Sequence, residues 1–127
     1  MSKILSIVDT AYRATQEEQD DAVLWVNRAL VNAGAQIDLL LQGSAVSYAV
    51  AHQDPSGLVL GSVAIERPAV PPQDLLALQT GGLRVFVDAD DIEARGMDRK
   101  RLREEFTIIS KQELAGLMGQ YDQIWHW

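Results

Sequence analysis

The chain has 127 residues, of which 47% are apolar, a length and composition typical of one domain with a buried core. It carries 18 acidic and 11 basic residues, and its net charge of −7 argues against direct binding to nucleic acid phosphates. Cysteine is absent, which excludes disulfides, thiolate metal sites and persulfide chemistry on this chain. No apolar run approaches the roughly 20 residues of a membrane span, and no signal peptide is recognisable. We expect one cytoplasmic domain, residues 1–127, that does not enter a membrane.

Short apolar runs alternate with amphipathic segments along the whole chain. Strands are predicted over residues 4–8, 37–41, 83–87, 106–109 and 123–127. Helices are predicted over residues 15–33, 45–51, 74–78, 90–95 and 111–121. Because strands alternate with helices, we predict a three-layer α/β/α fold around a mainly parallel sheet of about five strands.

The first predicted helix has a capping pattern at its start and an apolar stripe along one side. Thr15 and Glu18 form a capping-box pattern, and Gly34 occupies the stop position. The apolar stripe predicted to face the sheet is Ala22, Trp25, Val26, Ala29, Leu30 and Ala33.

Residues 52–73 differ from the rest of the chain. They contain all four prolines and the apolar run "GLVLGSVAI". We predict a long excursion here, with an extended segment, before the short helix over residues 74–78.

Polar residues follow three of the predicted strands. In a parallel sheet these carboxyl ends lie along one edge, so Asp9, Gln42, Gly43 and Asp88 are candidates for a ligand site. Asp9 and Asp88 could pair as metal ligands or as an acid and a base. Alternatively, Asp88 simply caps the acidic helix that follows it, and Gly43 simply forms a tight turn.

The last strand ends in two tryptophans at alternate positions. Trp125 and Trp127 either pack into the core or form an interface with another subunit, since large aromatics make good anchors. His52 and His126 have no partner at metal-ligand spacing, so no metal site is predicted on them. The basic cluster "RKRLR" is followed by two glutamates and is typical of a solvated face.

Four segments resemble the DsrE/DsrF/DsrH group, whose bacterial counterparts are TusD, TusC and TusB. They are the first strand with its loop, "LLLQGSAV", "VFVDADDIEARG" and "ISKQELAGLMGQYDQIWHW". The resemblance covers most of the chain except the excursion over residues 52–73. The segment "DDIEARG", the capped final helix and Trp127 are most similar to the DsrH/TusB type, whereas the length is closer to the DsrE and DsrF types.

The resemblance implies a subunit that assembles with itself or with DsrE/DsrF-like sister subunits in a complex that relays sulfur as a protein persulfide. Such relays serve tRNA thiolation or sulfur oxidation. In the sulfur-carrying members the reactive cysteine lies at the position that Asp88 occupies here. The resemblance therefore implies a non-catalytic subunit that needs no cofactor.

Three interpretations of Asp88 stay open at this point. In the first, Asp88 caps a helix in a subunit without catalytic function. In the second, it belongs to a pocket that binds a small ligand in a stand-alone homo-oligomer or enzyme. The third interpretation is that the likeness extends to the fold alone. We favour the helix cap, because the chain has no thiol to offer.

Overall fold

The computed structural model describes residues 2–11, 22–53, 59–64 and 70–127. The helices and strands occur in the following order: β1 (Lys3–Val8), α1 (Ala22–Asn32), β2 (Gln36–Leu41), the 3₁₀ helix η1 (Gly43–Ala49), β3 (Val59–Leu60), β4 (Val63–Ala64), α2 (Pro71–Thr80), β5 (Val85–Asp88), α3 (Ala89–Ala94), the 3₁₀ helix η2 (Arg99–Arg101), β6 (Thr107–Ile109), α4 (Lys111–Met118) and β7 (Gln123–His126).

Five of the strands form one parallel sheet in the order β6-β5-β2-β1-β7. β2 lies at its centre, with Ile37 beside Ile4 of β1 and Leu39 beside Val85 of β5. Five of the six residues of β2 are buried, because helices cover both faces of a parallel sheet. The predicted α/β fold with five parallel strands is confirmed.

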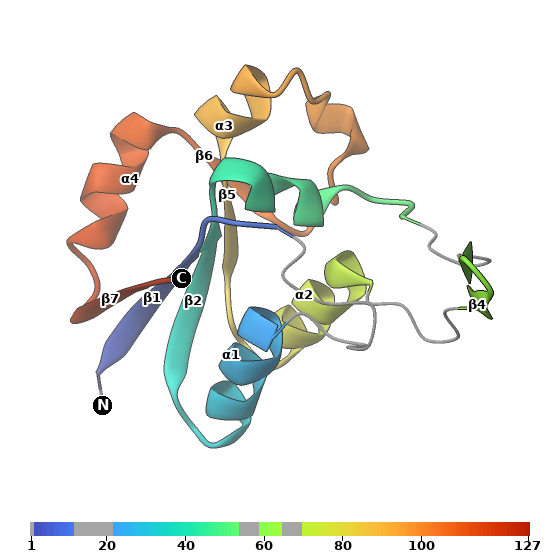
Figure 1. Ribbon diagram of the computed structural model, residues 1–127. Helices are drawn as coiled ribbons and strands as arrows, with labels where there is room; N and C mark the ends of the chain where they lie inside the picture. The colour runs from blue at the N-terminus through green and yellow to red at the C-terminus, as the bar shows by residue number, and fades with distance from the viewer. Residues whose placement is uncertain (1, 12–21, 54–58, 65–69) are drawn as a thin grey trace.

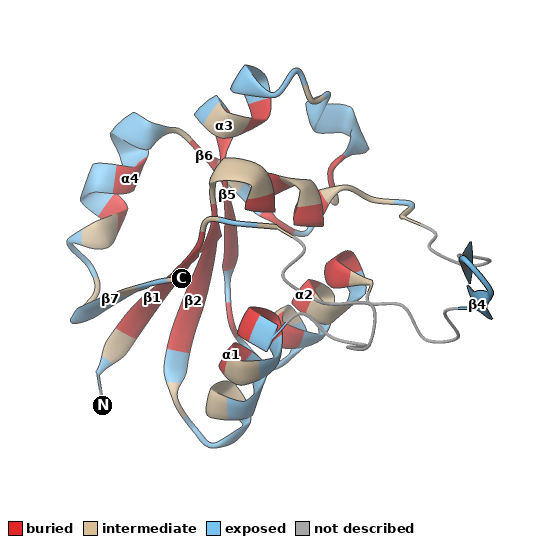
Figure 2. Cartoon of the chain, viewed as in Figure 1, coloured by how far each residue is buried: buried red, intermediate tan, exposed pale blue. Residues whose placement is uncertain are grey.

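Alternate residues along the strands enter two separate cores. Figures 1 and 2 show α4 on one side of the sheet and α1 with α2 on the other. Ile4 and Val8 of β1 pack into the larger core, which also contains residues of α1, α2, α3 and η1. Leu5 and Ile7 point the other way, into a smaller core that Leu114 and Leu117 of α4 close. In the described part of the chain, α4 thus covers the second face of the sheet.

The predicted buried face of α1 is wrong in part. The residues of α1 that are buried are Val23, Leu24 and Asn27, whereas Trp25 is 60% exposed. The predicted stripe was wrong because Asn27 is polar and was therefore not expected to be buried. Asn27 nevertheless lies in the core, where its Nδ2 donates a 2.8 Å hydrogen bond to the Val23 carbonyl. The capping box at Thr15 and Glu18 lies outside the described residues.

The excursion contains the small antiparallel pair β3 and β4, which form a sheet of their own. α2 begins earlier than predicted, at Pro71 and Pro72. Proline lacks an N–H that the first turn would leave unbonded anyway, so it starts the helix rather than preventing it. No helix in the ranges that the structure describes is long and apolar enough to cross a bilayer.

Candidate functional site

Asp88 is the last residue of β5 and its side chain is only 1% exposed. Its Oδ1 accepts hydrogen bonds from the backbone N–H of Asp90 at 2.9 Å and of Asp91 at 3.2 Å. Those two amides belong to the first turn of α3, where no carbonyl within the helix can reach them. Asp88 is therefore the N-cap of α3, as the sequence predicted.

The second oxygen of Asp88 binds a cation that comes from α4. Lys111 Nζ lies 2.5 Å from Asp88 Oδ2 and 3.4 Å from Asp91 Oδ2. The hydrogen bond to Asp88 raises the pKa of Lys111 above its ordinary value, and the charges of Asp88 and Asp91 add to this effect. The Lys111 side chain stays 54% exposed, so the buried carboxylate is neutralised by a cation that still contacts water.

Asp91 connects this ion pair to the turn after β2. Its Oδ2 accepts a 2.8 Å hydrogen bond from the N–H of Gly43. Partial burial pushes the pKa of Asp91 upward, but the Gly43 N–H and the Lys111 charge outweigh burial and hold that pKa below its ordinary value. Asp91 is thus ionised and joins α3 to η1.

Gly43 is required by its surroundings. Its φ of +57° is a left-handed conformation, and a Cβ at this position would lie 2.6 Å from the Asp9 carbonyl oxygen and 2.7 Å from Asp9 Oδ1. Only glycine therefore allows the end of β1 and the start of η1 to approach so closely. The tight-turn interpretation of Gly43 agrees with this geometry, which also brings Asp9 against it.

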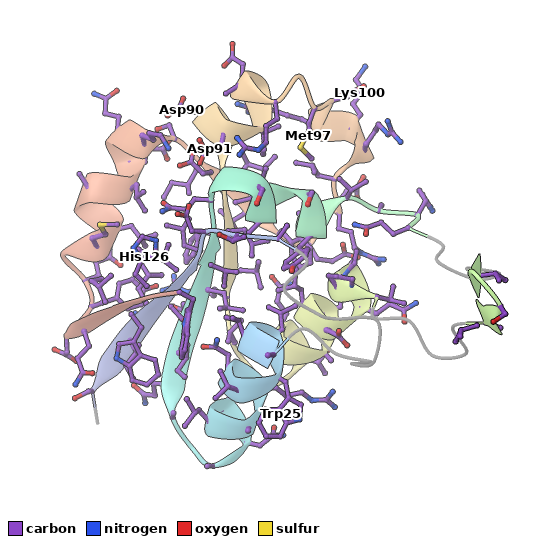
Figure 3. All side chains as sticks on the ribbon, in the orientation of Figure 1. Trp25, Asp90, Asp91, Met97, Lys100 and His126 are labelled. Carbon is purple, nitrogen blue, oxygen red and sulfur yellow. The ribbon has the colours of Figure 1, made fainter. Side chains whose placement is uncertain are left out.

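Asp9, Gly43, Asp88, Asp91 and Lys111 form a continuous group at the carboxyl ends of the strands, which we call the carboxyl-end cluster. At its outer side, Asp9 Oδ2 lies 3.5 Å from His126 Nε2 of β7. Figure 3 shows Asp91 and Asp90 at the same end of the sheet, between α3 and α4. Asp90 Oδ2 accepts a 2.9 Å bond from the Lys111 N–H and so fixes the start of α4.

The pairing of Asp9 with Asp88 as metal ligands finds no support in this geometry. The Asp88 oxygens bond to two amides and to Lys111, whereas Asp9 contacts His126. Within the described ranges, no group of three or more His, Asp or Glu residues could hold a metal ion. Gln42 lies at the predicted place, with its N–H donating 3.0 Å to the Val8 carbonyl, but its side chain does not cap η1.

Trp125 of β7 and Trp127, the residue that follows this strand, are both half-buried against the larger core. Their rings meet edge to face with centroids 6.4 Å apart, and Trp127 Nε1 donates a 2.7 Å hydrogen bond to Ser6 Oγ. Together with Leu30 and His126 they line a hollow of about 460 Å³. Core packing thus accounts for part of each indole and leaves part of it accessible.

A second buried carboxylate, which was not predicted from the sequence, lies toward the opposite end of the sheet. Asp38 of β2 is 7% exposed, and its Oδ1 accepts the Arg84 N–H at 2.9 Å. Its Oδ2 accepts Arg84 Nη2 at 2.9 Å and the Tyr121 hydroxyl at 2.6 Å. Burial and the bond to Asp38 both raise the pKa of Tyr121. The only local signal was one acidic residue inside an apolar strand.

Comparison with known proteins gives structural matches alone, since no family model and no curated protein matches the chain. The ychN protein from E. coli superposes with a TM-score of 0.76 over 100% of both chains at 19% identity. The chain has the ychN fold. MTH1491 from Methanobacterium thermoautotrophicum, a protein of unknown function, matches over 98% of both chains with a TM-score of 0.63 at 14% identity. Both proteins share the α/β fold that was expected from the sequence, and at these identities the likeness extends to the fold alone.

Proposed function

We propose that the chain is a cytoplasmic, single-domain, non-catalytic subunit of a sulfur-relay complex of the DsrEFH/TusBCD type. The observation that carries the proposal is the state of Asp88. It occupies the position that the resemblance assigns to the sulfur-carrying cysteine, and its two oxygens are engaged by two amides and one ammonium group. A sulfur carrier needs an accessible thiolate, which a buried carboxylate cannot replace.

The partner in this proposal is a DsrE/DsrF-like sister subunit, either alone or together with a second copy of the chain. The edge strand β7 offers the contact, because Trp125 and Trp127 are half-buried there beside a hollow of about 460 Å³. Aromatic side chains that are already held in place lose little entropy when a partner covers them, which makes them strong anchors. Trp125 is the better probe, since Trp127 also bonds to Ser6 inside the subunit.

The test is the native mass of the purified chain by light scattering, alone and after co-expression with DsrE/DsrF-like sister subunits. A defined hetero-oligomer that Trp125→Glu disrupts supports the proposal, provided that the variant melts at the wild-type temperature. Trp25→Glu is the matched control, because Trp25 is exposed on α1 and lies outside the hollow. Failure to join any sister subunit contradicts the proposal.

A second candidate is a stand-alone homo-oligomer that binds a small ligand at the carboxyl-end cluster. The observation that favours it is the Asp9–His126 contact, whose side chains are 44% and 56% exposed and therefore accessible to a ligand. A ligand present at 100 times its Kd would stabilise the fold by about 2.7 kcal/mol. A thermal shift that Asp9→Asn removes, in a chain that forms a homo-oligomer alone, would favour this candidate over the relay subunit.

A further inference from the structure

A hollow of about 530 Å³ lies beside the edge strand β6, and neither candidate function uses it. We call it the β6 groove. Its lining residues come from η2, from the loop that follows and from β6 itself: Arg99, Lys100, Leu102, Arg103, Glu104, Phe106 and Ile108. Its volume lies within the range of sites that hold a small ligand or a few residues of peptide.

The floor of the β6 groove is apolar and held firmly. Leu102 and Phe106 are buried and Ile108 is half-buried, and all three pack against the larger core. The backbone on either side of Leu102 is also fixed. The Ala51 N–H donates to the Arg101 carbonyl at 2.8 Å, and the Arg103 N–H donates to the Ala49 carbonyl at 2.9 Å. The floor can therefore receive an apolar side chain without first becoming ordered.

The rim of the groove concentrates positive charge on a chain whose net charge is −7. Arg99 and Lys100 are exposed, and Figure 3 shows Lys100 pointing outward from η2. Among the described residues, neither of these side chains takes part in an ion pair, whereas Arg103 pairs with Glu105 at 3.2 Å. Two exposed cations over an apolar floor are complementary to an acidic partner that also carries apolar side chains.

The strand itself supplies the third element of a binding surface. β6 pairs with β5 on one side, and in the described part of the chain no strand pairs with it on the other. Thr107 is exposed, so solvent reaches β6 at this residue. An unpaired edge presents N–H and C=O groups that an extended peptide can bond as an added strand.

We propose that the β6 groove binds an extended acidic segment of a partner protein, which adds a strand to β6. The segment places an apolar side chain on Leu102, Phe106 and Ile108, and its flanking carboxylates meet Arg99 and Lys100. This interaction goes beyond the proposed function and does not depend on it. It differs from the β7 contact in its chemistry, because it is electrostatic and salt-sensitive.

Charge and shape favour a peptide over a nucleic acid at this surface. A long polyanion would extend past the two cations and meet the acidic remainder of the chain, whereas a short peptide is held within about one Debye length of them, roughly 10 Å at 0.1 M salt. Glu104 in the lining opposes any anion placed beside it, so the carboxylates of the peptide are expected at Arg99 and Lys100 instead.

The test is fluorescence anisotropy with a labelled peptide that alternates Glu with Val. We expect binding by the wild-type chain, weakened at least tenfold by the double substitution Arg99→Glu and Lys100→Glu, and unchanged in Arg28→Glu, an exposed cation on α1 outside the groove. The same peptide with N-methylated backbone amides should bind at least tenfold more weakly, because it cannot donate strand hydrogen bonds. Melting temperatures of both variants check that the fold is intact.

Three results would overturn the proposal. The first is absence of peptide binding, or binding that the double substitution leaves unchanged. The second is tighter binding of a single-stranded RNA of equal charge that depends on Arg99 and Lys100. The third is loss of a wild-type dimer on the double substitution, which would mean that a second copy occupies the groove. None of these results bears on assembly through β7, so the two proposals can fail separately.

Discussion

The two buried carboxylates, Asp88 and Asp38, lie at opposite ends of the same sheet and are bound in similar ways. Each bonds to backbone N–H on one oxygen and to a half-exposed cation on the other, Lys111 at 54% and Arg84 at 51% exposure. They differ in their remaining partner, because Asp88 caps a helix while Asp38 accepts the Tyr121 hydroxyl. Lys111 begins α4 and Tyr121 follows its end, so the two carboxylates hold both ends of the helix that closes the smaller core.

The similarity of the two sites shows that a buried charge at the carboxyl ends of the strands can serve only to stabilise the fold. Asp88 is a candidate for a ligand site because proteins with a parallel α/β sheet bind ligands at the carboxyl ends of the strands. Asp38 has nearly the same burial and the same kind of ion pair at the other end, where the fold gives no such expectation. Matched substitutions at Asp88 and Asp38 can therefore distinguish a structural role from a functional one.

The largest effect is expected for Asp88→Ala, which should lower the free energy of unfolding by about 2–4 kcal/mol. It removes the cap of α3, worth about 1–2 kcal/mol, and deprives Lys111 of its main partner. Asp38→Ala should cost less, about 1–3 kcal/mol, because no helix cap is lost and Arg84 returns easily to water. Urea unfolding measures the loss of unfolding free energy in each variant. A larger loss for Asp38→Ala than for Asp88→Ala would contradict the expected order.

Removing the cations is expected to have a smaller effect. Lys111→Met should cost about 1–2 kcal/mol, less than the 3–5 kcal/mol of a fully buried pair, because two amides still bond to Asp88 and the ammonium was half-exposed. Arg84→Met should cost a similar amount, since the Arg84 N–H and Tyr121 remain on Asp38. Lys111→Arg should restore most of the loss in denaturant titrations. A loss for Lys111→Met with no rescue would show that packing matters more than charge.

Tyr121→Phe should cost about 1–2 kcal/mol near neutral pH, because one hydrogen bond to a carboxylate is lost. The pKa of Tyr121 is raised, so the stability it contributes is complete below the unfolded value of about 10 and is lost as pH rises through the folded value. The difference between wild type and variant should therefore shrink above about pH 10. The raised pKa of Lys111 also destabilises the fold in alkali, but equally in both proteins. A difference that stays constant up to strongly alkaline pH would contradict this assignment.

The smallest effect is expected for Asp91→Asn, about 0.5–1 kcal/mol at neutral pH, since the amide oxygen can still accept the Gly43 N–H. The pKa of Asp91 is lowered, so its contribution is present above the unfolded value of about 3.9 and is lost as pH falls through the folded value. The free energies of unfolding of the two proteins should therefore converge as the pH is lowered. A difference in unfolding free energy that persists in acid would show that packing, and not charge, causes the loss of stability.

The sequence by itself determined where the five strands of the main sheet lie along the chain, their parallel arrangement and the cap of α3. Continuous apolar runs specify strands buried on both faces, and a capping pattern acts over only two or three residues. Asp88 was therefore predictable as a helix cap and was found as one, and Ser110 Oγ likewise accepts a hydrogen bond from the Glu113 N–H at the start of α4.

Tertiary structure alone decided which distant residues meet. Lys111 reaches Asp88 across 23 positions and Tyr121 reaches Asp38 across 83, because the register of the sheet and the placement of α4 bring them together. The buried face of α1 was decided in the same way, since the packing of α1 buries Asn27, whose Nδ2 bonds to the Val23 carbonyl while its Oδ1 has no hydrogen-bond partner among the described residues. Local propensity contains no information on such pairings, which depend on how the helices pack against the sheet.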